Sequence, residues 1–97
     1  MYSKNEILEF LKTHKDALEK HYHIQKIGLF GSYARDEATS DSDIDFFVHF
    51  DHVKYDYVYQ LKEFLSDSLQ KSVDIVIDSK YIKERNLKII KKDLIYV

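Results

Sequence analysis

The spacing of apolar residues along the chain predicts three helices. A capping-box pattern formed by Ser3 and Glu6 precedes an apolar stripe at helical spacing, made of Ile7, Leu8, Leu11 and Leu18. A second stripe, within residues 55–69, consists of Tyr57, Val58, Leu61, Phe64, Leu65 and Leu69. A last helix passes through Ile82, Ile89 and Ile90, with Asp78 or Ser79 as the expected N-cap.

Between these stripes, short apolar runs have the composition of strands. Residues 24–30, 43–50 and 73–77 are rich in β-branched and aromatic side chains, and a short terminal strand is expected at 94–97. After the first run, the chain is expected to turn at Gly31 into a short helix and then a polar loop. The predicted order is helix, strand, short helix, strand, helix, strand, helix.

The turn at Gly31 and Ser32 has the properties of a phosphate site. A glycine lets the backbone approach a ligand closely, and the hydroxyl of Ser32 can donate to a phosphate oxygen. The N–H groups that open a helix attract an anion. Taken alone, Ser32 is also an ordinary helix N-cap.

Two carboxylates follow ten residues after the turn. Asp43 and Asp45 are separated by one residue at the start of a strand, so both side chains point to the same side. Like charges held this close repel each other, and a bridging divalent cation relieves the repulsion. Mg²⁺ is preferred where the other ligands are phosphate oxygens and water. Asp43 and Asp45 are therefore candidate metal ligands.

A third carboxylate stands in the apolar run 73–77. Asp74 is the one charged residue of this run, which has the pattern of a buried strand, and a buried lone aspartate is costly unless it is paired or metal-bound. If this strand lies beside the strand of Asp45, three carboxylates converge. Such a site suits in-line nucleotidyl transfer assisted by two metal ions.

These motifs resemble the signature of the DNA polymerase β superfamily of nucleotidyltransferases. Gly31-Ser32, ten residues and then Asp43-x-Asp45 is similar to its minimal, MNT-type branch, and nearly the whole chain fits. The resemblance implies one domain over residues 1–97, with an α/β (α+β) fold of a small mixed sheet flanked by helices in the order αβαβαβα.

The resemblance also assigns roles to individual residues. Gly31 and Ser32 would hold the β and γ phosphates of ATP, and Asp43 and Asp45 would bind two Mg²⁺ ions, with Mn²⁺ as an alternative. Asp74 would ligate one metal and act as general base on the acceptor hydroxyl.

Two further residues are assigned to nucleotide binding by the resemblance. Arg35 matches a common arginine of the branch, although a surface ion pair explains it equally well. Ser42 precedes Asp43 in the motif. Asp36 stands where relatives usually carry glycine, so the loop from Asp36 to Ser42 is expected to run differently.

Length and composition limit what else to expect. A chain of 97 residues suits one domain. The absence of cysteine fits a reducing compartment, so a cytoplasmic protein is expected. No apolar run approaches the roughly 20 residues needed to cross a bilayer. With a net charge of −2, nucleic acid is a weak candidate partner, although residues 83–92 carry a local basic run.

Other polar and aromatic clusters have plainer interpretations. His21 and His23 lack a third ligand nearby in the sequence and are expected to be solvated. His49 shares a strand face with Asp45 but lies farther along it. Tyr55 and Tyr59, one helical turn apart, either pack on a partner or base or flank the core stripe with their hydroxyls in water.

Three hypotheses for function remain open. In the first, the chain moves AMP from ATP to a hydroxyl and releases pyrophosphate. The resemblance implies that the acceptor is a tyrosine of a cognate HEPN-type ribonuclease toxin, since such minimal transferases are commonly paired with these toxins as antitoxins. In the second, the chain is a binding module that neutralises the toxin by occlusion. In the third, the acceptor is a small-molecule hydroxyl. A hetero-oligomer with the toxin is compatible with the first two.

Overall fold

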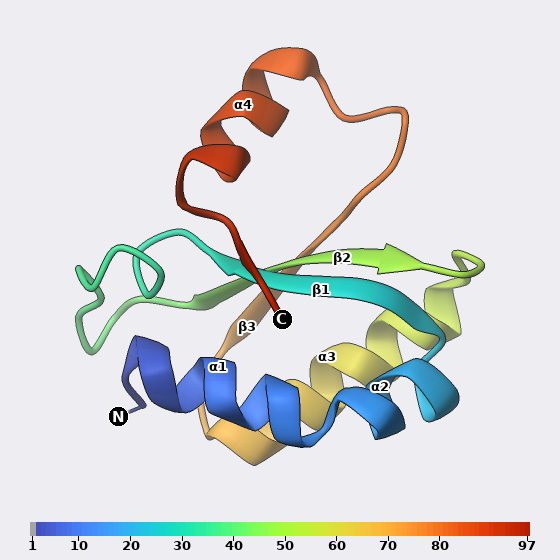
Figure 1. Ribbon diagram of the computed structural model, residues 1–97, viewed down its shortest axis with the longest axis horizontal. Helices are drawn as coiled ribbons and strands as arrows, with labels where there is room; N and C mark the ends of the chain where they lie inside the picture. The colour runs from blue at the N-terminus through green and yellow to red at the C-terminus, as the bar shows by residue number, and fades with distance from the viewer. Residues whose placement is uncertain (1) are drawn as a thin grey trace.

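The computed structural model describes residues 2–97 and contains one mixed four-stranded sheet (Figure 1). Its strand order is β3-β2-β1-β4. The strands β1 and β2 are antiparallel, β2 and β3 are parallel, and β4 pairs antiparallel with β1. The strands are β1 (Ile24–Phe30), β2 (Ile44–Phe50), β3 (Val73–Ile77) and β4 (Ile95–Tyr96). The small mixed sheet expected from the sequence is confirmed.

Of the four helices within residues 2–97, three cover one face of the sheet (Figure 1). They are α1 (Lys4–Thr13), α2 (Lys15–His21) and α3 (Tyr55–Leu69). The helix α3 connects the parallel strands β2 and β3, because a parallel pair requires a crossover. No helix within residues 2–97 is long and apolar enough to span a membrane.

The N-terminal helix is divided where the sequence predicts one continuous helix. The capping box of Ser3 and Glu6 forms as predicted, with Glu6 N–H donating to Ser3 Oγ at 3.1 Å. At His14 the backbone leaves helical geometry, and the ring Nδ1–H donates to the Phe10 carbonyl oxygen at 2.9 Å. This bond and the contact between the tilted rings of His14 and Phe10, whose centroids are 4.2 Å apart, stabilise the break.

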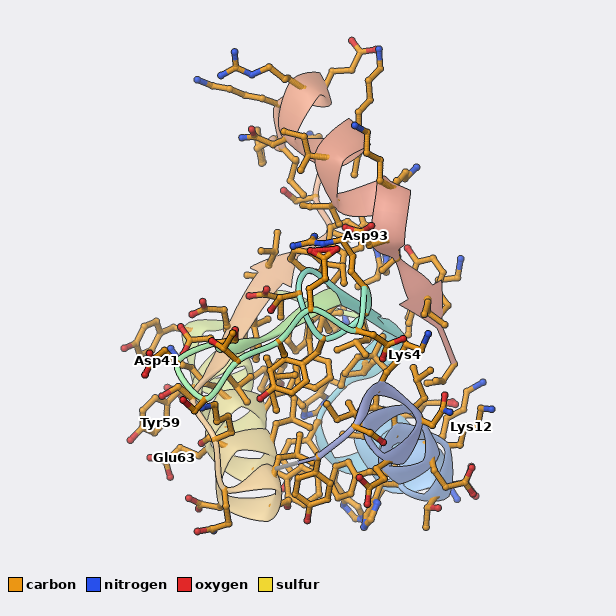
Figure 2. The ribbon with its side chains drawn as sticks, turned by 90° about the vertical axis from the view of Figure 1, so that its left-hand side faces the viewer. Lys4, Lys12, Asp41, Tyr59, Glu63 and Asp93 are labelled. Carbon is orange, nitrogen blue, oxygen red and sulfur yellow. The ribbon has the colours of Figure 1, made fainter. Side chains whose placement is uncertain are left out.

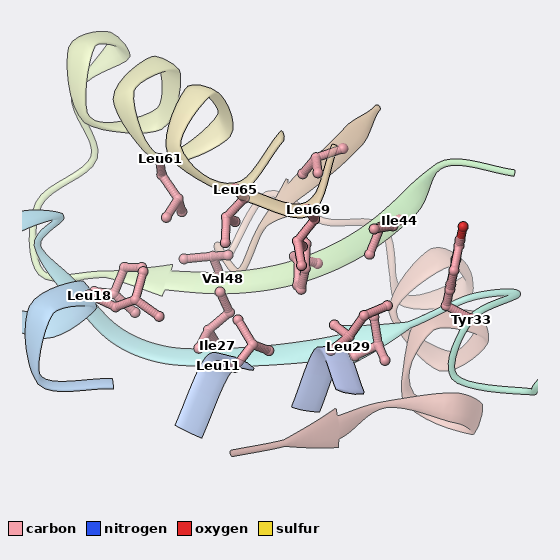
Figure 3. Close-up of a cluster of buried hydrophobic side chains, with 14 of the residues drawn as sticks. Leu11, Leu18, Ile27, Leu29, Tyr33, Ile44, Val48, Leu61, Leu65 and Leu69 are labelled. Atoms are coloured by element: carbon pink, nitrogen blue, oxygen red, sulfur yellow. The ribbon is translucent and has the colours of Figure 1, made fainter. Parts of the chain in front are cut away.

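The main hydrophobic core fills the space between these helices and the sheet (Figure 3). The stripe of α3 packs as predicted, with Leu61, Leu65 and Leu69 buried against Val48 and its neighbours in the sheet. Full burial of one such leucine stabilises the fold by about 2 kcal/mol. This core holds β2 and β3 in the register that aligns the candidate site.

The last helix, α4 (Glu84–Asp93), lies over the opposite face of the sheet (Figure 1). Phe47 and Ile90 are buried but do not belong to the main core, because both lie on the α4 side. A Cβ at Gly28 would approach Leu94 Cδ1 at 2.7 Å and the Ile95 carbonyl oxygen at 3.0 Å, so this glycine lets the end of α4 pack closely on β1.

Two predictions are wrong, although the α/β class is correct: the short helix after β1 and the N-cap of α4. Residues 31–36 form a turn instead of a short helix, and the Glu37 N–H closes this turn by donating to the Ser32 carbonyl oxygen at 2.8 Å. The N-cap of α4 is Lys83, not Asp78 or Ser79. Ser79 instead accepts from the Tyr81 N–H in a turn that precedes the helix.

Candidate active site

Three residues from adjacent strands lie in one row across the sheet, on the face that α4 covers. Phe30 at the end of β1 is paired with Asp45 of β2, and Asp45 is paired with Asp74 of β3. Side chains alternate along a strand, so Asp74 points away from the core that contains Val73. Aligned residues on neighbouring strands are about 4.8 Å apart, which makes the two carboxylates direct neighbours.

The charge of Asp45 is destabilised by its surroundings. Partial burial of the side chain, as the largest cause, and then the neighbouring charges of Asp74 and Asp43 together raise the pKa of Asp45 from its usual 3.8 to about 6. The positive charge of Arg35 lowers the pKa of Asp45 but does not offset these effects. The charges of Asp43, Asp74 and Arg35 therefore all act on Asp45.

The structure corrects the expected environment of Asp74. The sequence pattern suggests a buried strand, but β3 is at the edge of the sheet and the Asp74 side chain is exposed. An edge strand has a neighbour on one side only, so Asp74 faces solvent as well as Asp45. This exposure leaves room for an incoming hydroxyl group.

The turn after β1 lies directly beside Asp45. Gly31 has a φ of 78°, and a Cβ at this position would overlap the Asp45 carboxylate oxygen. Glycine adopts this backbone conformation without strain and lets the turn approach the carboxylate closely.

Main-chain donors of the turn are available to an anion. Within residues 2–97, the N–H groups of Ser32, Tyr33 and Ala34 have no hydrogen-bond acceptor, and the first intraturn bond runs from the Arg35 N–H to the Gly31 carbonyl oxygen at 3.1 Å. Successive unpaired N–H groups form a concave anion site. Because no helix begins here, Ser32 is not an N-cap, and its side chain is half-buried beside these donors.

Replacing Gly31 by alanine is expected to lower the free energy of unfolding by about 1 to 3 kcal/mol, from the left-handed φ and the overlap with Asp45. Urea denaturation of the wild type and variant measures this change. In an Asp45→Ala background, the same substitution should cost less because the overlapping carboxylate is gone. Equal costs in both backgrounds would contradict the role of the close approach.

Arg35 and Ser42 have local partners in the structure. The Arg35 guanidinium donates at 2.8 Å to the carboxylate of Asp93, which lies at the end of α4 (Figure 2). The guanidinium also lies 3.6 Å from the Glu37 carboxylate. Ser42 Oγ accepts from the Thr39 N–H at 2.9 Å and thereby closes the loop before β2. Nucleotide binding by Arg35 and Ser42 stays a prediction, since both side chains have structural roles in the free protein.

Asp36 adopts a left-handed conformation, which glycine adopts most readily. Its φ is 59°, in the left-handed region that aspartate tolerates better than most residues. Lys4 of α1 forms an ion pair with its carboxylate at 3.1 Å. An aspartate therefore fits this position in the turn, and its carboxylate has a partner.

A residue that sequence reasoning missed is Tyr33. Its side chain is 3% exposed, and its hydroxyl is buried without a hydrogen-bond partner among residues 2–97. Burial and the nearby charge of Asp43 raise the pKa of Tyr33. Tyr33 thus anchors the turn in the core next to the motif. No periodicity marks this role, because the residue belongs to a turn.

The histidines lie apart from this site. His23 stacks on Tyr57 with ring centroids 3.8 Å apart, and His49 Nδ1 lies 3.5 Å from the Asp78 carboxylate. Asp78 and His49 occupy the same face as Asp45 but follow two rows farther along the strands.

The donor chemistry of the site fits Mg²⁺ without forming a complete metal cage. Within residues 2–97, no three carboxylate or imidazole groups surround a common point closely enough to hold a metal by themselves. Mg²⁺ is commonly held by one or two carboxylates together with substrate phosphates and water. The mutual repulsion that raises the pKa of Asp45 is what a cation would relieve. Asp43, Asp45 and Asp74 are the residues that would hold it.

A phosphate-sized turn beside clustered carboxylates on a mixed sheet defines a nucleotidyl-transfer type of site. The sequence model of the nucleotidyltransferase domain family matches residues 11–97. The chain belongs to this family and is a nucleotidyltransferase by its domain. The resemblance stated from the motifs is thereby confirmed.

Two similar proteins are both named as protein adenylyltransferases, in agreement with the family match. A Methanocaldococcus jannaschii protein, provisionally named protein adenylyltransferase, is 41% identical over the full length of both chains. Protein adenylyltransferase MntA of Thermococcus cleftensis is 35% identical to this chain. The match covers 100% of this chain and 98% of that protein.

Solved structures share the fold. A structure provisionally described as a minimal nucleotidyltransferase is 30% identical, with a TM-score of 0.72 over 91% of this chain and 93% of that one. A complex of a tri-AMPylated Shewanella oneidensis HEPN toxin with an MNT antitoxin matches with a TM-score of 0.63. That match covers 92% of this chain and 70% of the other at 20% identity, so it supports the fold alone.

Proposed function

We propose that the protein transfers AMP from ATP to a tyrosine hydroxyl of a HEPN-type ribonuclease toxin and thereby acts as its antitoxin in the cytoplasm. The observation that carries the transfer reaction is the row of Asp45 and Asp74 beside the Gly31 turn. In this proposal the carboxylates serve the metal and the acceptor, and the neighbouring main-chain donors serve the phosphates. The nucleotide and the acceptor can therefore meet on one face of the sheet.

Each part of the site has a role in this reaction. The free N–H groups of the turn and the Ser32 hydroxyl donate to the β and γ phosphates, which orients the α-phosphorus toward β3. Asp74 accepts the proton of the acceptor hydroxyl, whose oxygen forms a bond to the α-phosphorus. The bond from this phosphorus to the pyrophosphate oxygen breaks, and pyrophosphate leaves.

Asp43 and Asp45 keep the site negative until substrate arrives. When bound, Mg²⁺ supplies charge neutralisation for the phosphates and lowers the pKa of the acceptor hydroxyl. The exposure of Asp74 at the sheet edge fits its role as proton acceptor, because a large partner can approach there without displacing the core.

The proposed partner is supported by the similar proteins. Two full-length relatives have names that specify a protein as the adenylylation acceptor. A protein with the same fold forms a complex with an AMPylated HEPN toxin. The same pairing for this chain explains how a small transferase domain obtains its acceptor.

Transfer is tested with ATP labelled at the α-phosphate, Mg²⁺ and the HEPN-type protein encoded beside this chain. We expect the partner to gain the mass of AMP on tyrosine. Asp74→Asn should lower the transfer rate by about 10² to 10⁴ because the general base is lost, while calorimetry should show ATP binding retained. Ser32→Ala should slow transfer less than Asp45→Asn does.

The matched control is Asp67→Asn, which removes an exposed carboxylate of α3. This variant should transfer AMP at the wild-type rate. If the partner gains no label and Asp45→Asn still neutralises its toxicity, occlusion is the correct function. Label that appears only on a small molecule would identify a different acceptor class and contradict the proposal.

A further inference from the structure

A cleft of about 590 Å³ lies between α4 and the sheet, and the proposed reaction does not account for it. Its lining is mostly apolar, from Phe30, Val76, Ile82, Ile89 and Ile90. Cavities of this size bind small organic molecules in many proteins. Figure 2 shows α4 apart from the other helices, with Asp93 at its C-terminal end. The ion pair between Asp93 and Arg35 connects this end of α4 to the turn of residues 31–36.

The cleft begins where the aspartate row ends. Phe30 lies in the same row as Asp45 and Asp74 and also lines the cleft. Val76, another lining residue, is on the same face as Asp74 and two residues farther along β3, a distance of about 7 Å. A group attached to the α-phosphate through one ribose ring would therefore reach the cleft.

The walls of the cleft include apolar and aromatic surface that the fold leaves in solvent. Tyr81 is 82% exposed and Ile89 is 59% exposed, although both line the cleft. The polar lining residues are Lys83 and Asn86. A side-chain amide carries both a donor and an acceptor, which is the pattern required to pair with the donor and acceptor edge of adenine.

We propose that this cleft binds the base of the nucleoside triphosphate, with the ring between the sheet and α4 and the Asn86 amide reading its polar edge. This inference rests on the proposed function, because the aspartates position the phosphates. A flat ring with a polar edge fits apolar walls that carry one uncharged amide. The acceptor tyrosine is less suited to the cleft, since Asp74 is open to solvent at the sheet edge and receives a partner from there.

The test compares binding of ATP with binding of inorganic triphosphate, each with Mg²⁺, by calorimetry. Tyr81→Ala and Asn86→Ala should each weaken ATP binding roughly tenfold, the loss of one packing or hydrogen-bonding contact. Both variants should bind triphosphate as the wild type does. Asp45→Asn should weaken both ligands, because it acts on the phosphates.

Two matched variants control for exposure and residue type. Tyr55 on α3 is 83% exposed, close to the value for Tyr81, and Asn5 on α1 is exposed as Asn86 is. Tyr55→Ala and Asn5→Ala should leave ATP affinity unchanged.

A second ligand tests the role of Asn86 directly. Purine riboside triphosphate lacks the exocyclic amino group of ATP, so the wild type should bind it more weakly. Asn86→Ala should bind the two ligands equally.

The inference and the proposed function can fail separately. If Asp45→Asn weakens ATP binding but the cleft variants do not, the base lies elsewhere and the transfer proposal stands. Cleft variants with normal ATP affinity and slower transfer would show that the cleft holds the acceptor, which overturns the inference. A wild type that binds neither ATP nor triphosphate would overturn both.

Discussion

Asp45→Asn is expected to stabilise the metal-free protein at pH 7 and to abolish its activity. In the folded state the pKa of Asp45 is about 6, above its usual 3.8, so folding favours the protonated carboxyl. The resulting stabilisation is present below about pH 4 and is lost as the pH rises through about 6. After discounting for the partly exposed side chain, we expect a gain of about 1 to 2 kcal/mol in the variant at pH 7.

The pH profile identifies the source of this gain. Urea denaturation in chelator should show wild-type stability falling between pH 4 and 7 more steeply than that of Asp45→Asn. Transfer by the variant should fall at least a hundredfold, because a metal-binding charge is lost. Asp67→Asn should change neither quantity. Identical pH profiles for wild type and Asp45→Asn would contradict the electrostatic account of the site.

Mg²⁺ with ATP is expected to stabilise the wild type by about 2.7 kcal/mol at a hundredfold excess over the dissociation constant. For a domain of this size, that corresponds to a rise in melting temperature of roughly 10 °C or more. The effect should weaken below about pH 6, where Asp45 is protonated in the free protein. Thermal unfolding followed by circular dichroism at several pH values measures it.

The control for this stabilisation is a double variant that removes the same number of charges from two exposed aspartates elsewhere in the chain. Asp16→Asn/Asp67→Asn should retain the full shift, whereas Asp43→Asn/Asp45→Asn should lose it. If both double variants respond to Mg²⁺ and ATP as the wild type does, the aspartates are not the metal ligands.

Most of the regular elements were predictable because their information is local. The helix α3 begins and ends at the predicted residues 55 and 69, since its apolar stripe alone specifies which face is buried. The strands β1 and β3 also match their apolar runs. The capping box of α1 could be predicted for the same reason, as it involves residues three apart.

The class of protein was also predictable, because the motif combines particular residues at a definite spacing. Gly31 and Ser32 follow one apolar strand, Asp43 and Asp45 open the next, and the family match confirms the class of protein that this spacing indicates. Their individual roles remain predictions that the substitutions above test.

Only the tertiary structure decided how these residues meet. The sequence alone determined that Asp45 and Asp74 belong to strands, but the parallel register of β2 and β3 makes them neighbours. The edge position of β3, which exposes Asp74, depends on strand order, and apolar content does not reveal it. Likewise the turn at 31–36 and the placement of α4 depend on contacts with Asp45, Asp93 and β1 that lie far away in sequence, so no local pattern encodes them.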